Sequence, residues 1–169
     1  MQVSSDIENL ALPIWSGDCQ WLFASDGHED LYRISSRGRH ATRISDKGSW
    51  FSLVKNGSVF FDVIDGAKLA IWSQPVNGSE PRPLTGMPDL NADDSWTATE
   101  HGIYYTSLIT KTSTVNYYDF ATRTIHRICT LPQSPTQGGG LAVSPDGRWL
   151  LFTQTDDAQS DIMIARHFQ

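Results

Sequence analysis

The sequence predicts an all-β fold of the β-propeller class, built of four similar four-stranded blades. Three observations predict it: a repeat of roughly 40 residues, a strand–tight turn–strand pattern that opens each repeat, and pairs of large apolar residues two positions apart after each turn. No window shows a 3.6-residue apolar period with helix caps, which excludes a solenoid of helices. A sandwich of short strands is the alternative, but the shared register of the repeats favours the propeller.

The clearest turn lies in the last repeat, where Pro145, Asp146 and Gly147 supply a fixed φ, a local side-chain cap and a positive φ. The same shape occurs at Asp18-Cys19, and looser versions of the turn are Asn56-Gly57 and His101-Gly102. Aligning the residue that opens each second strand gives four anchors at spacings of 38, 44 and 46 residues: Trp21, Val59, Ile103 and Trp149. Two positions later, on the same strand face, come Phe23, Phe61, Tyr105 and Leu151.

Third strands are predicted at 31–34, 69–72, 115–120 and 162–165, and fourth strands at 43–45, 83–85 and 127–129. The last repeat stops before a fourth strand. The predicted blades are therefore 13–45, 50–85, 96–131 and 140–169, within a single domain of residues 1–169.

Ring closure is the open question of this architecture. Residues 2–10 precede the first blade, and we hypothesise that they pair with residues 162–166 and remove an exposed sheet edge. Four blades can close as one compact ring, or two chains can join as a homodimer into an eight-bladed ring with C2 symmetry.

A family resemblance rests on the segment Val143-Ser-Pro-Asp-Gly-Arg-Trp-Leu-Leu-Phe152, followed by Ser160-Asp-Ile-Met-Ile164. It resembles the repeat of TolB-like propellers, which also occurs in the N-terminal propeller of dipeptidyl peptidase IV relatives. From Trp96 onward the chain is most similar to the C-terminal propeller of bacterial multidomain regulators, often attached to a Ser/Thr kinase or winged-helix domain. The resemblance implies the last half of a larger propeller. The kinase, winged-helix and hydrolase activities of such proteins are not carried over, because no segment of those types is present. The second and third repeats depart from the motif.

Charge and hydropathy exclude several function classes. The net charge of −6 argues against a nucleic-acid surface, which needs clustered Lys and Arg. No apolar stretch approaches 18 residues, so we expect no membrane insertion. Residues 1–12 do not form a signal peptide, so the chain is expected to be cytoplasmic, or periplasmic if it is a fragment of a membrane-anchored regulator. Neither Cys19 nor Cys129 has a partner at zinc-ligand spacing.

No catalytic, cofactor-binding or metal-binding residue is predicted. The chain has no G-x-S-x-G nucleophile elbow, and no Lys-Ser/Thr follows the glycines 138–140. Acidic turns at 28–30 and at 156, 157 and 161 could hold a cation through oxygen ligands. A role in shaping the turns is favoured, because Asp30 and Asp161 each begin a third strand.

One face of the propeller is the predicted partner-binding face, because the loops between blades and those between second and third strands meet there. It gathers Asp26, His28, Glu29, Trp50, Trp96, Lys111, Asp156 and Asp157. Exposed aromatic rings among polar groups suit a protein or peptide partner. The alternative is that Trp50 and Trp96 pack between blades.

Two function classes remain at this stage. The favoured one is a non-catalytic scaffold for protein or peptide interaction. The other is a propeller enzyme or enzyme subunit, of hydrolase or lyase type, that uses the central channel. The predicted inner strands, 13–17, 51–55, 96–100 and 140–144, offer only Lys55 and Glu100 as charged groups, which favours the scaffold.

Overall fold

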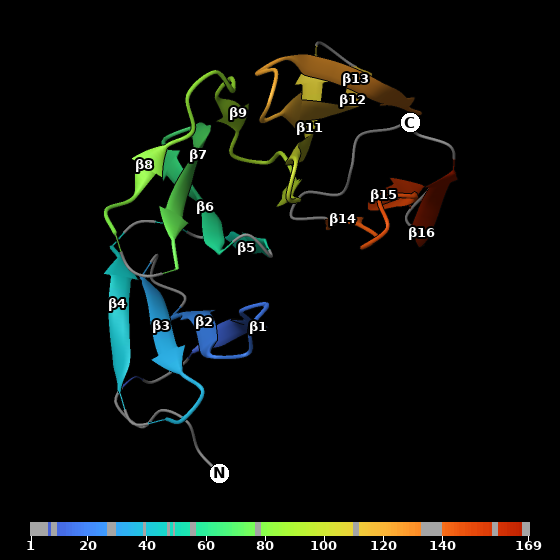
Figure 1. The fold of residues 1–169 in the computed structure, drawn as a ribbon. Helices are drawn as coiled ribbons and strands as arrows, with labels where there is room; N and C mark the ends of the chain where they lie inside the picture. Colours follow the sequence, from blue (N-terminus) through green and yellow to red (C-terminus); the bar gives the residue numbers. More distant parts are fainter. Residues whose placement is uncertain are drawn as a thin grey trace. The chain divides into compact units, whose positions relative to one another are not determined.

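A computed structural model of the chain describes residues 7, 10–26, 30–38, 40–46, 48, 50–54, 57–76, 79–109, 112–132, 140–156 and 159–166. These residues form sixteen β-strands and no helix, so the described part holds no helix that could cross a membrane. The chain divides into two compact units, residues 1–85 and 86–169, and each unit contains two antiparallel sheets (Figure 1).

The first unit holds two sheets whose strands follow one another in chain order. The first sheet is β1 (Ala11–Trp15), β2 (Trp21–Ser25), β3 (Leu31–Ser35) and β4 (Ala41–Ser45). The second is β5 (Phe51–Val54), β6 (Ser58–Asp65), β7 (Lys68–Pro75) and β8 (Arg82–Pro83). This antiparallel meander of four strands is the organisation of a propeller blade, as predicted.

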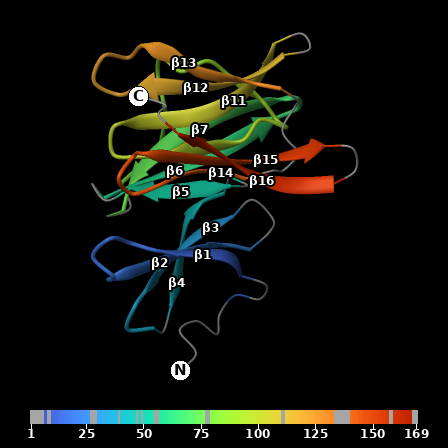
Figure 2. The ribbon, with the colours of Figure 1, turned by 90° about the vertical axis from the view of Figure 1, so that its right-hand side faces the viewer.

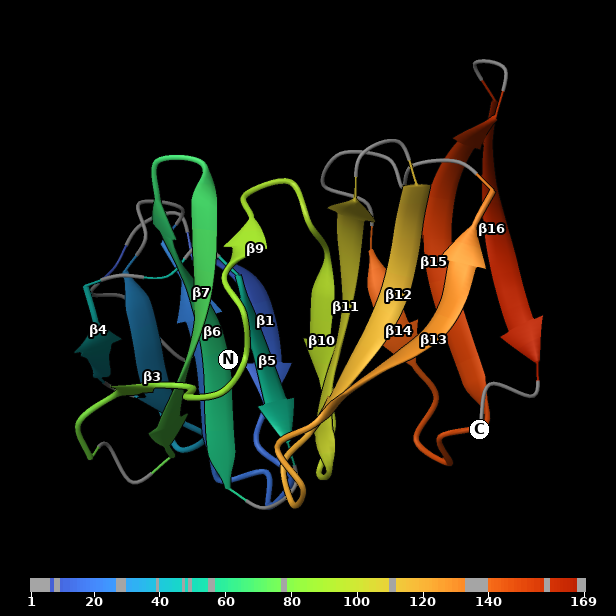
Figure 3. The same cartoon turned by 90° about the horizontal axis from the view of Figure 1, so that it is seen from above.

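The second unit begins with the short β9 (Leu90–Asn91) and continues with the third sheet, β10 (Trp96–Ala98), β11 (Gly102–Ile109), β12 (Thr112–Asp119) and β13 (Ile125–Leu131). The fourth sheet has three strands among the described residues, β14 (Leu141–Val143), β15 (Trp149–Asp156) and β16 (Gln159–Arg166) (Figure 3). Of the predicted closing strand 2–10, all but Ile7 and Leu10 lie outside the described residues.

An apolar core lies between the first and second sheets. Its buried residues, each at most 7% exposed, are Phe23, Leu31, Phe51, Val59 and Phe61. Full burial of such a side chain stabilises the fold by about 1.5–3 kcal/mol. The second unit has an equivalent core, to which the third and fourth sheets contribute Val115, Leu131, Leu141, Leu150 and Phe152.

Two long polar side chains also join the first and second sheets. The Arg33 guanidinium lies 4.4 Å above the Trp21 ring and donates a 2.6 Å hydrogen bond to the Val76 carbonyl. In the opposite direction, Gln74 Nε2 donates to the Ile44 carbonyl at 3.4 Å. Among the described residues, the contact between the sheets thus combines an apolar core with hydrogen bonds from Arg33 and Gln74.

The turns that open the first and fourth blades have the same hydrogen bonds. Ser144 Oγ donates to Asp146 Oδ1 at 2.5 Å and accepts the Trp149 amide at 2.9 Å. The first blade repeats this with Ser16, Asp18 and Trp21, at 2.6 and 2.9 Å. In each turn the aspartate also accepts a hydrogen bond from the backbone amide of the residue before the tryptophan. The Arg148 amide donates to Asp146 at 3.1 Å, and the Gln20 amide donates to Asp18 at 3.0 Å. The segment Ser16-Gly17-Asp18-Cys19 therefore forms the same turn as the Ser-Pro-Asp-Gly motif, although its sequence differs.

The third blade has a shorter turn, and this corrects the alignment of the anchors. The Thr99 amide donates to the Gly102 carbonyl at 2.8 Å and closes this turn. The corresponding backbone bonds of the first and fourth blades, at 2.9 Å, join Ser16 to Trp21 and Ser144 to Trp149. Gly102 therefore takes the position of the two tryptophans, and Ile103 is equivalent to Leu22 and Leu150. The predicted alignment of Ile103 with Trp21 and Trp149 is wrong by one residue, which reverses the sheet face.

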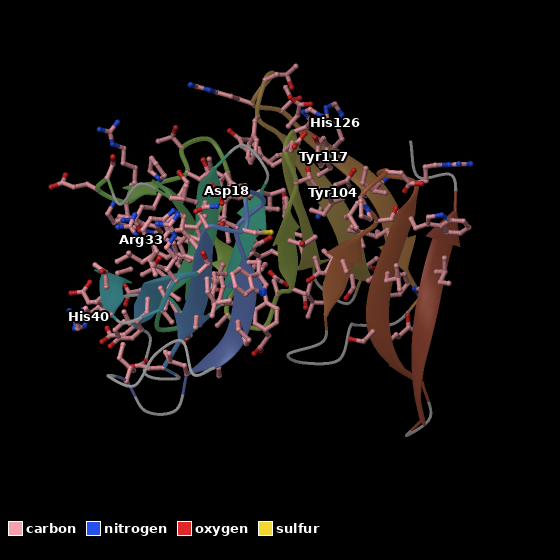
Figure 4. The ribbon with its side chains drawn as sticks, turned by 60° about the horizontal axis from the view of Figure 1, so that its bottom comes forward. Asp18, Arg33, His40, Tyr104, Tyr117 and His126 are labelled. Carbon is pink, nitrogen blue, oxygen red and sulfur yellow. The ribbon has the colours of Figure 1, made fainter. Side chains whose placement is uncertain are left out.

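Gly102 is required at this position by the neighbouring strand. A Cβ atom there would lie 2.5 Å from the Tyr117 ring and would also collide with the Tyr118 carbonyl. Tyr117 packs against Tyr104 with ring centroids 4.6 Å apart (Figure 4). Burial, followed by the nearby Tyr104 and Asp119, raises the pKa of Tyr117 to about 12. In the third blade, a tyrosine from β12 thus occupies space near the position where the first and fourth blades have tryptophan.

Substitutions at Cys19 and Gly147 test whether the turns of the first and fourth blades are equivalent. Cys19 has a positive φ of 56°, and Gly147, at the corresponding position, has a φ of 68°. A left-handed conformation costs a residue with a Cβ about 1–2 kcal/mol relative to glycine. We expect Cys19→Gly to raise the free energy of unfolding by about 1 kcal/mol and Gly147→Ala to lower it by a similar amount. Denaturant unfolding measures both, and no gain for Cys19→Gly would contradict the turn equivalence.

The turn carboxylates predict the direction of the pH dependence of stability. The Ser144 hydroxyl and the Arg148 amide lower the pKa of Asp146, and the Ser16 hydroxyl and the Gln20 amide lower that of Asp18. A lowered folded pKa gives stability that is complete above the ordinary aspartate value of about 4 and lost as pH falls through the folded value. We expect a shallower acid slope for Asp146→Asn in unfolding titrations; an unchanged slope would refute this role.

Candidate functional site

The predicted partner-binding face is described in part. His28, Glu29, Lys111 and Asp157 lie outside the described residues, as does the side chain of Asp156 at the end of β15. The remaining three residues differ in exposure: Trp96 is 4% exposed, as the packing alternative predicts, while Trp50 is 47% exposed. Asp26 is half-buried after β2. Of the two tryptophans predicted for this face, Trp50 is therefore the one whose ring is available for contact.

Backbone and side-chain bonds hold Trp50 at the start of the second blade. Its amide donates to Asp62 Oδ1 at 2.8 Å, and its carbonyl accepts the Asp62 amide at 3.1 Å. Asp62 lies on β6 and is only 3% exposed. We call this pair of bonds the inner-strand clamp. Because it binds both polar groups of the Trp50 backbone, the chain is fixed while the indole stays exposed.

The third blade has the same clamp with different residues. The Ser95 amide donates to Thr106 Oγ1 at 2.8 Å, and the Thr106 amide donates to the Ser95 carbonyl at 2.8 Å. In the fourth blade the Thr153 amide reaches the Gly140 carbonyl at 3.3 Å, while Thr153 Oγ1 has no partner among the described residues.

The sequence analysis missed this clamp, although a signal is present. Every repeat has three apolar residues followed by a short polar one, at 22–25, 59–62, 103–106 and 150–153. The structure buries this polar residue in the first three blades and leaves it half-buried in the fourth. The polar residue is Ser25, Asp62, Thr106 or Thr153.

The surroundings of Trp50 combine apolar and acidic groups. The register of the β5–β6 pair places Trp50 opposite Asp62. Ile64 follows Asp62 by two residues on the same face of β6, roughly 7 Å from Asp62 along the strand. Ile64 is 39% exposed. Asp65, next to Ile64, and Asp46, in the segment that leads to Trp50, are both exposed. Trp50 and Ile64 are thus two exposed apolar residues in neighbouring segments that also carry exposed carboxylates, of which Asp46 lies 3.8 Å from Arg43.

Asp26 and Asp30 shape the neighbouring turn of the first blade. Asp26 Oδ1 accepts the Asp30 amide at 3.3 Å, and the Asp26 amide donates to the Asp30 carbonyl at 3.2 Å. Asp30 Oδ2 binds Arg43 at 3.1 Å and accepts the Tyr32 hydroxyl at 3.2 Å. These contacts support the turn role predicted for Asp30. The described residues contain no group of three or more His, Cys, Asp or Glu side chains placed to hold a metal ion.

A polar cavity of about 370 Å³ lies at the other end of the second sheet from Trp50. It is lined by Ser58, Ser73, Gln74, Pro75, Ser79, Glu80 and Arg82. The Gln74 amide group donates across its wall to the Ser79 carbonyl at 2.8 Å. Gln74 is 2% exposed and also reaches the first sheet, so its main role is to hold the two sheets together.

Solved structures with the same arrangement of strands identify the fold. TolB from Acinetobacter baumannii matches 93% of this chain with a TM-score of 0.71 at 15% sequence identity, and a TolB-type protein from Agrobacterium tumefaciens matches 93% with a TM-score of 0.67 at 20% identity. The fold is that of TolB-like β-propellers. This chain spans 41% and 58% of the length of those two proteins. No family model matches the chain, and no curated protein matches it with significant sequence similarity.

TolB-like propeller folds also occur in enzymes. An oligogalacturonate lyase, solved in complex with manganese, matches 91% of this chain with a TM-score of 0.62 at 15% identity, and the chain spans 50% of its length. At these identities the likeness establishes the fold alone. The shared fold is therefore compatible with both function classes that the sequence leaves open.

The inner-strand clamp generates a stability prediction at Asp62. Removing a buried acceptor leaves the Trp50 amide without its partner, which costs about 1–3 kcal/mol. We expect Asp62→Ala to lower the free energy of unfolding by that amount, measured by denaturant unfolding. Asp62→Asn retains an acceptor oxygen and serves as the matched control, with a smaller loss. Equal losses in the two variants would show that the charge, and not the acceptor, matters at this position.

Proposed function

We propose that this chain is a non-catalytic propeller scaffold that binds a protein or peptide segment at the surface around Trp50. The observation that carries the proposal is the 47% exposure of a tryptophan whose backbone is held by the inner-strand clamp. An exposed tryptophan ring does not contribute the hydrophobic free energy that its burial would give, and the described part of the chain shows no interaction that offsets this loss. Binding a partner would recover it at a low cost in conformational entropy.

The chemistry of the surroundings specifies the partner segment. Ile64 extends the apolar area beside Trp50, which suits one large aromatic or aliphatic side chain from the partner. Asp65, next to Ile64, is exposed, and Asp46, although 3.8 Å from Arg43, is exposed as well. Lys or Arg flanking the apolar residue of the partner would be favoured electrostatically by these carboxylates. The net charge of −6 also favours a basic partner. The proposed ligand is thus a basic peptide segment with one large apolar anchor.

The alternative, an enzyme acting through the central channel, draws on the likeness to the oligogalacturonate lyase fold. That likeness concerns the fold, and no described cluster of side chains adds chemistry to it. The exposed Trp50 on a hydrogen-bonded backbone supports recognition instead. We therefore favour the scaffold.

A peptide display library tests the proposal. Panning random twelve-residue peptides on the purified chain should enrich sequences with one aromatic or large aliphatic residue next to Lys or Arg. Titration calorimetry with an enriched peptide should show at least about a tenfold loss of affinity for Trp50→Ser, because tryptophan anchors typically contribute about 2 kcal/mol or more. Affinity should also fall with added salt.

Ile125→Ser provides the matched control, since Ile125 is 45% exposed on β13 of the third blade. This variant should bind the enriched peptide like the parent chain. Failure to enrich any such motif, or unchanged affinity in Trp50→Ser, would overturn the proposal.

A further inference from the structure

The polar cavity of about 370 Å³ at the end of the second sheet has no part in the proposed scaffold function. The described residues that line it all belong to the first compact unit, residues 1–85. Its volume falls in the range of small-molecule sites, about 300–1,000 Å³. The lining contains no aromatic or large aliphatic side chain, so a molecule held there is recognised by polar groups.

One face of the second sheet contributes two hydroxyls and a guanidinium to this cavity. Ser73 on β7 lies between Phe60 and Arg82 in the cross-strand register, and Ser58 lies opposite Pro75. Because Ser58 and Phe60 are two residues apart on β6, both serines and Arg82 lie on the same face of the sheet. β6 and β7, which carry the serines, lie side by side in Figure 2. The three polar groups are therefore gathered on one face of paired strands.

Hydrogen bonds hold the segment that carries the rest of the lining, Ser79 and Glu80. The buried Gln74 side chain donates from Nε2 to the Ser79 carbonyl at 2.8 Å. The Val76 amide donates to the Gly57 carbonyl at 2.8 Å. These bonds tie residues 76 and 79 to the start of β6 and to β7. The cavity is therefore formed before a ligand arrives, which lowers the entropic cost of binding.

Several polar groups of the lining have no partner among the described residues. The Ser58 and Ser73 side chains are half-buried, and their hydroxyls make no hydrogen bond there. Glu80 and Arg82 carry opposite charges two residues apart, yet no ion pair joins them. Gln74 Oε1 is buried and also lacks a hydrogen-bond partner. A cavity that gathers unpaired donors and acceptors, with one charge of each sign, suits a molecule that brings the complementary groups.

We propose that this cavity binds a small zwitterion, namely a free α-amino acid or a dipeptide. The carboxylate of the ligand binds the Arg82 guanidinium and the serine hydroxyls, and its ammonium group binds the Glu80 carboxylate. Hydrogen bonds to charged groups are shorter and stronger than those between neutral groups, and arginine can bind a carboxylate through two parallel bonds. A ligand with only one charge meets a like charge at Glu80 or Arg82, so the pair selects a molecule that carries both charges.

Thermal unfolding of the whole chain with single amino acids and dipeptides at millimolar concentration tests the proposal. At least one of them should raise the melting temperature, because a ligand that binds only the folded state stabilises it. Titration calorimetry with that ligand should show at least about a tenfold loss of affinity for Arg82→Gln and for Glu80→Gln. The N-acetylated amide of the same ligand, which lacks both charges, should not bind.

Matched controls remove the same charges elsewhere. Arg37→Gln and Glu100→Gln change exposed residues outside the cavity and should bind the ligand like the parent chain. Trp50→Ser should also bind it normally, because Trp50 lies at the other end of the second sheet. The amino-acid site and the proposed peptide surface can therefore fail or succeed independently. Circular dichroism of each variant confirms that the fold is retained.

Any of the following results would overturn the proposal. No shift of the melting temperature with any amino acid or dipeptide would show that the cavity takes no such ligand. Unchanged affinity in both Arg82→Gln and Glu80→Gln would place the binding site elsewhere. Equal affinity for the N-acetylated amide would show that the charges are not recognised. Equal affinity for a sugar acid such as glucuronate, which has no ammonium group, would assign the cavity to anions and leave Glu80 without a role.

Discussion

Every sheet of this protein has two faces to cover, because side chains alternate along a strand and both sets are rich in large apolar residues. A blade cannot bury both faces by itself. The first sheet buries Phe23 only because the second sheet lies against it with Val59 and Phe61, and the third and fourth sheets depend on each other in the same way. Contact between neighbouring blades is thus the interaction on which the fold of each blade depends.

Two local devices bring the blades into position for that contact. The serine–aspartate turn closes the inner hairpins of the first and fourth blades with the same bonds, although one has Cys19 where the other has Gly147. The inner-strand clamp then ties the start of a blade to its second strand through Asp62 or Thr106. At Asp62 the same clamp fixes the backbone of the exposed Trp50, so one device serves both the fold and the proposed binding surface.

The sequence predicted the strands and the four-blade count well, because turn residues and a period of two are local properties. The sheet face on which each residue lies was harder to predict. The hairpin of the third blade is shorter than those of the first and fourth, so aligning its glycine with theirs placed Ile103 on the wrong face. Trp50 and Trp96 both lie at the start of an inner strand, but the clamp aligns Trp50 with Ser95, and Trp96 therefore corresponds to the buried Phe51. The one-residue offset explains why one tryptophan is exposed and the other buried, and it became visible only once the clamp fixed the alignment of the blades. The clamp was predictable in principle from the short polar residue after each apolar triplet.

The close contact of Gly102 with Tyr117 has a consequence for the history of the repeats. If the four blades descend from one ancestral unit, a glycine at residue 102 makes room for the tyrosine ring that now lies over it. Restoring a side chain at residue 102 would collide with the Tyr117 ring and the Tyr118 carbonyl, so both would have to move. A substitution at one position thus restricts what a neighbouring position accepts, and repeats can diverge in sequence while keeping the same strands.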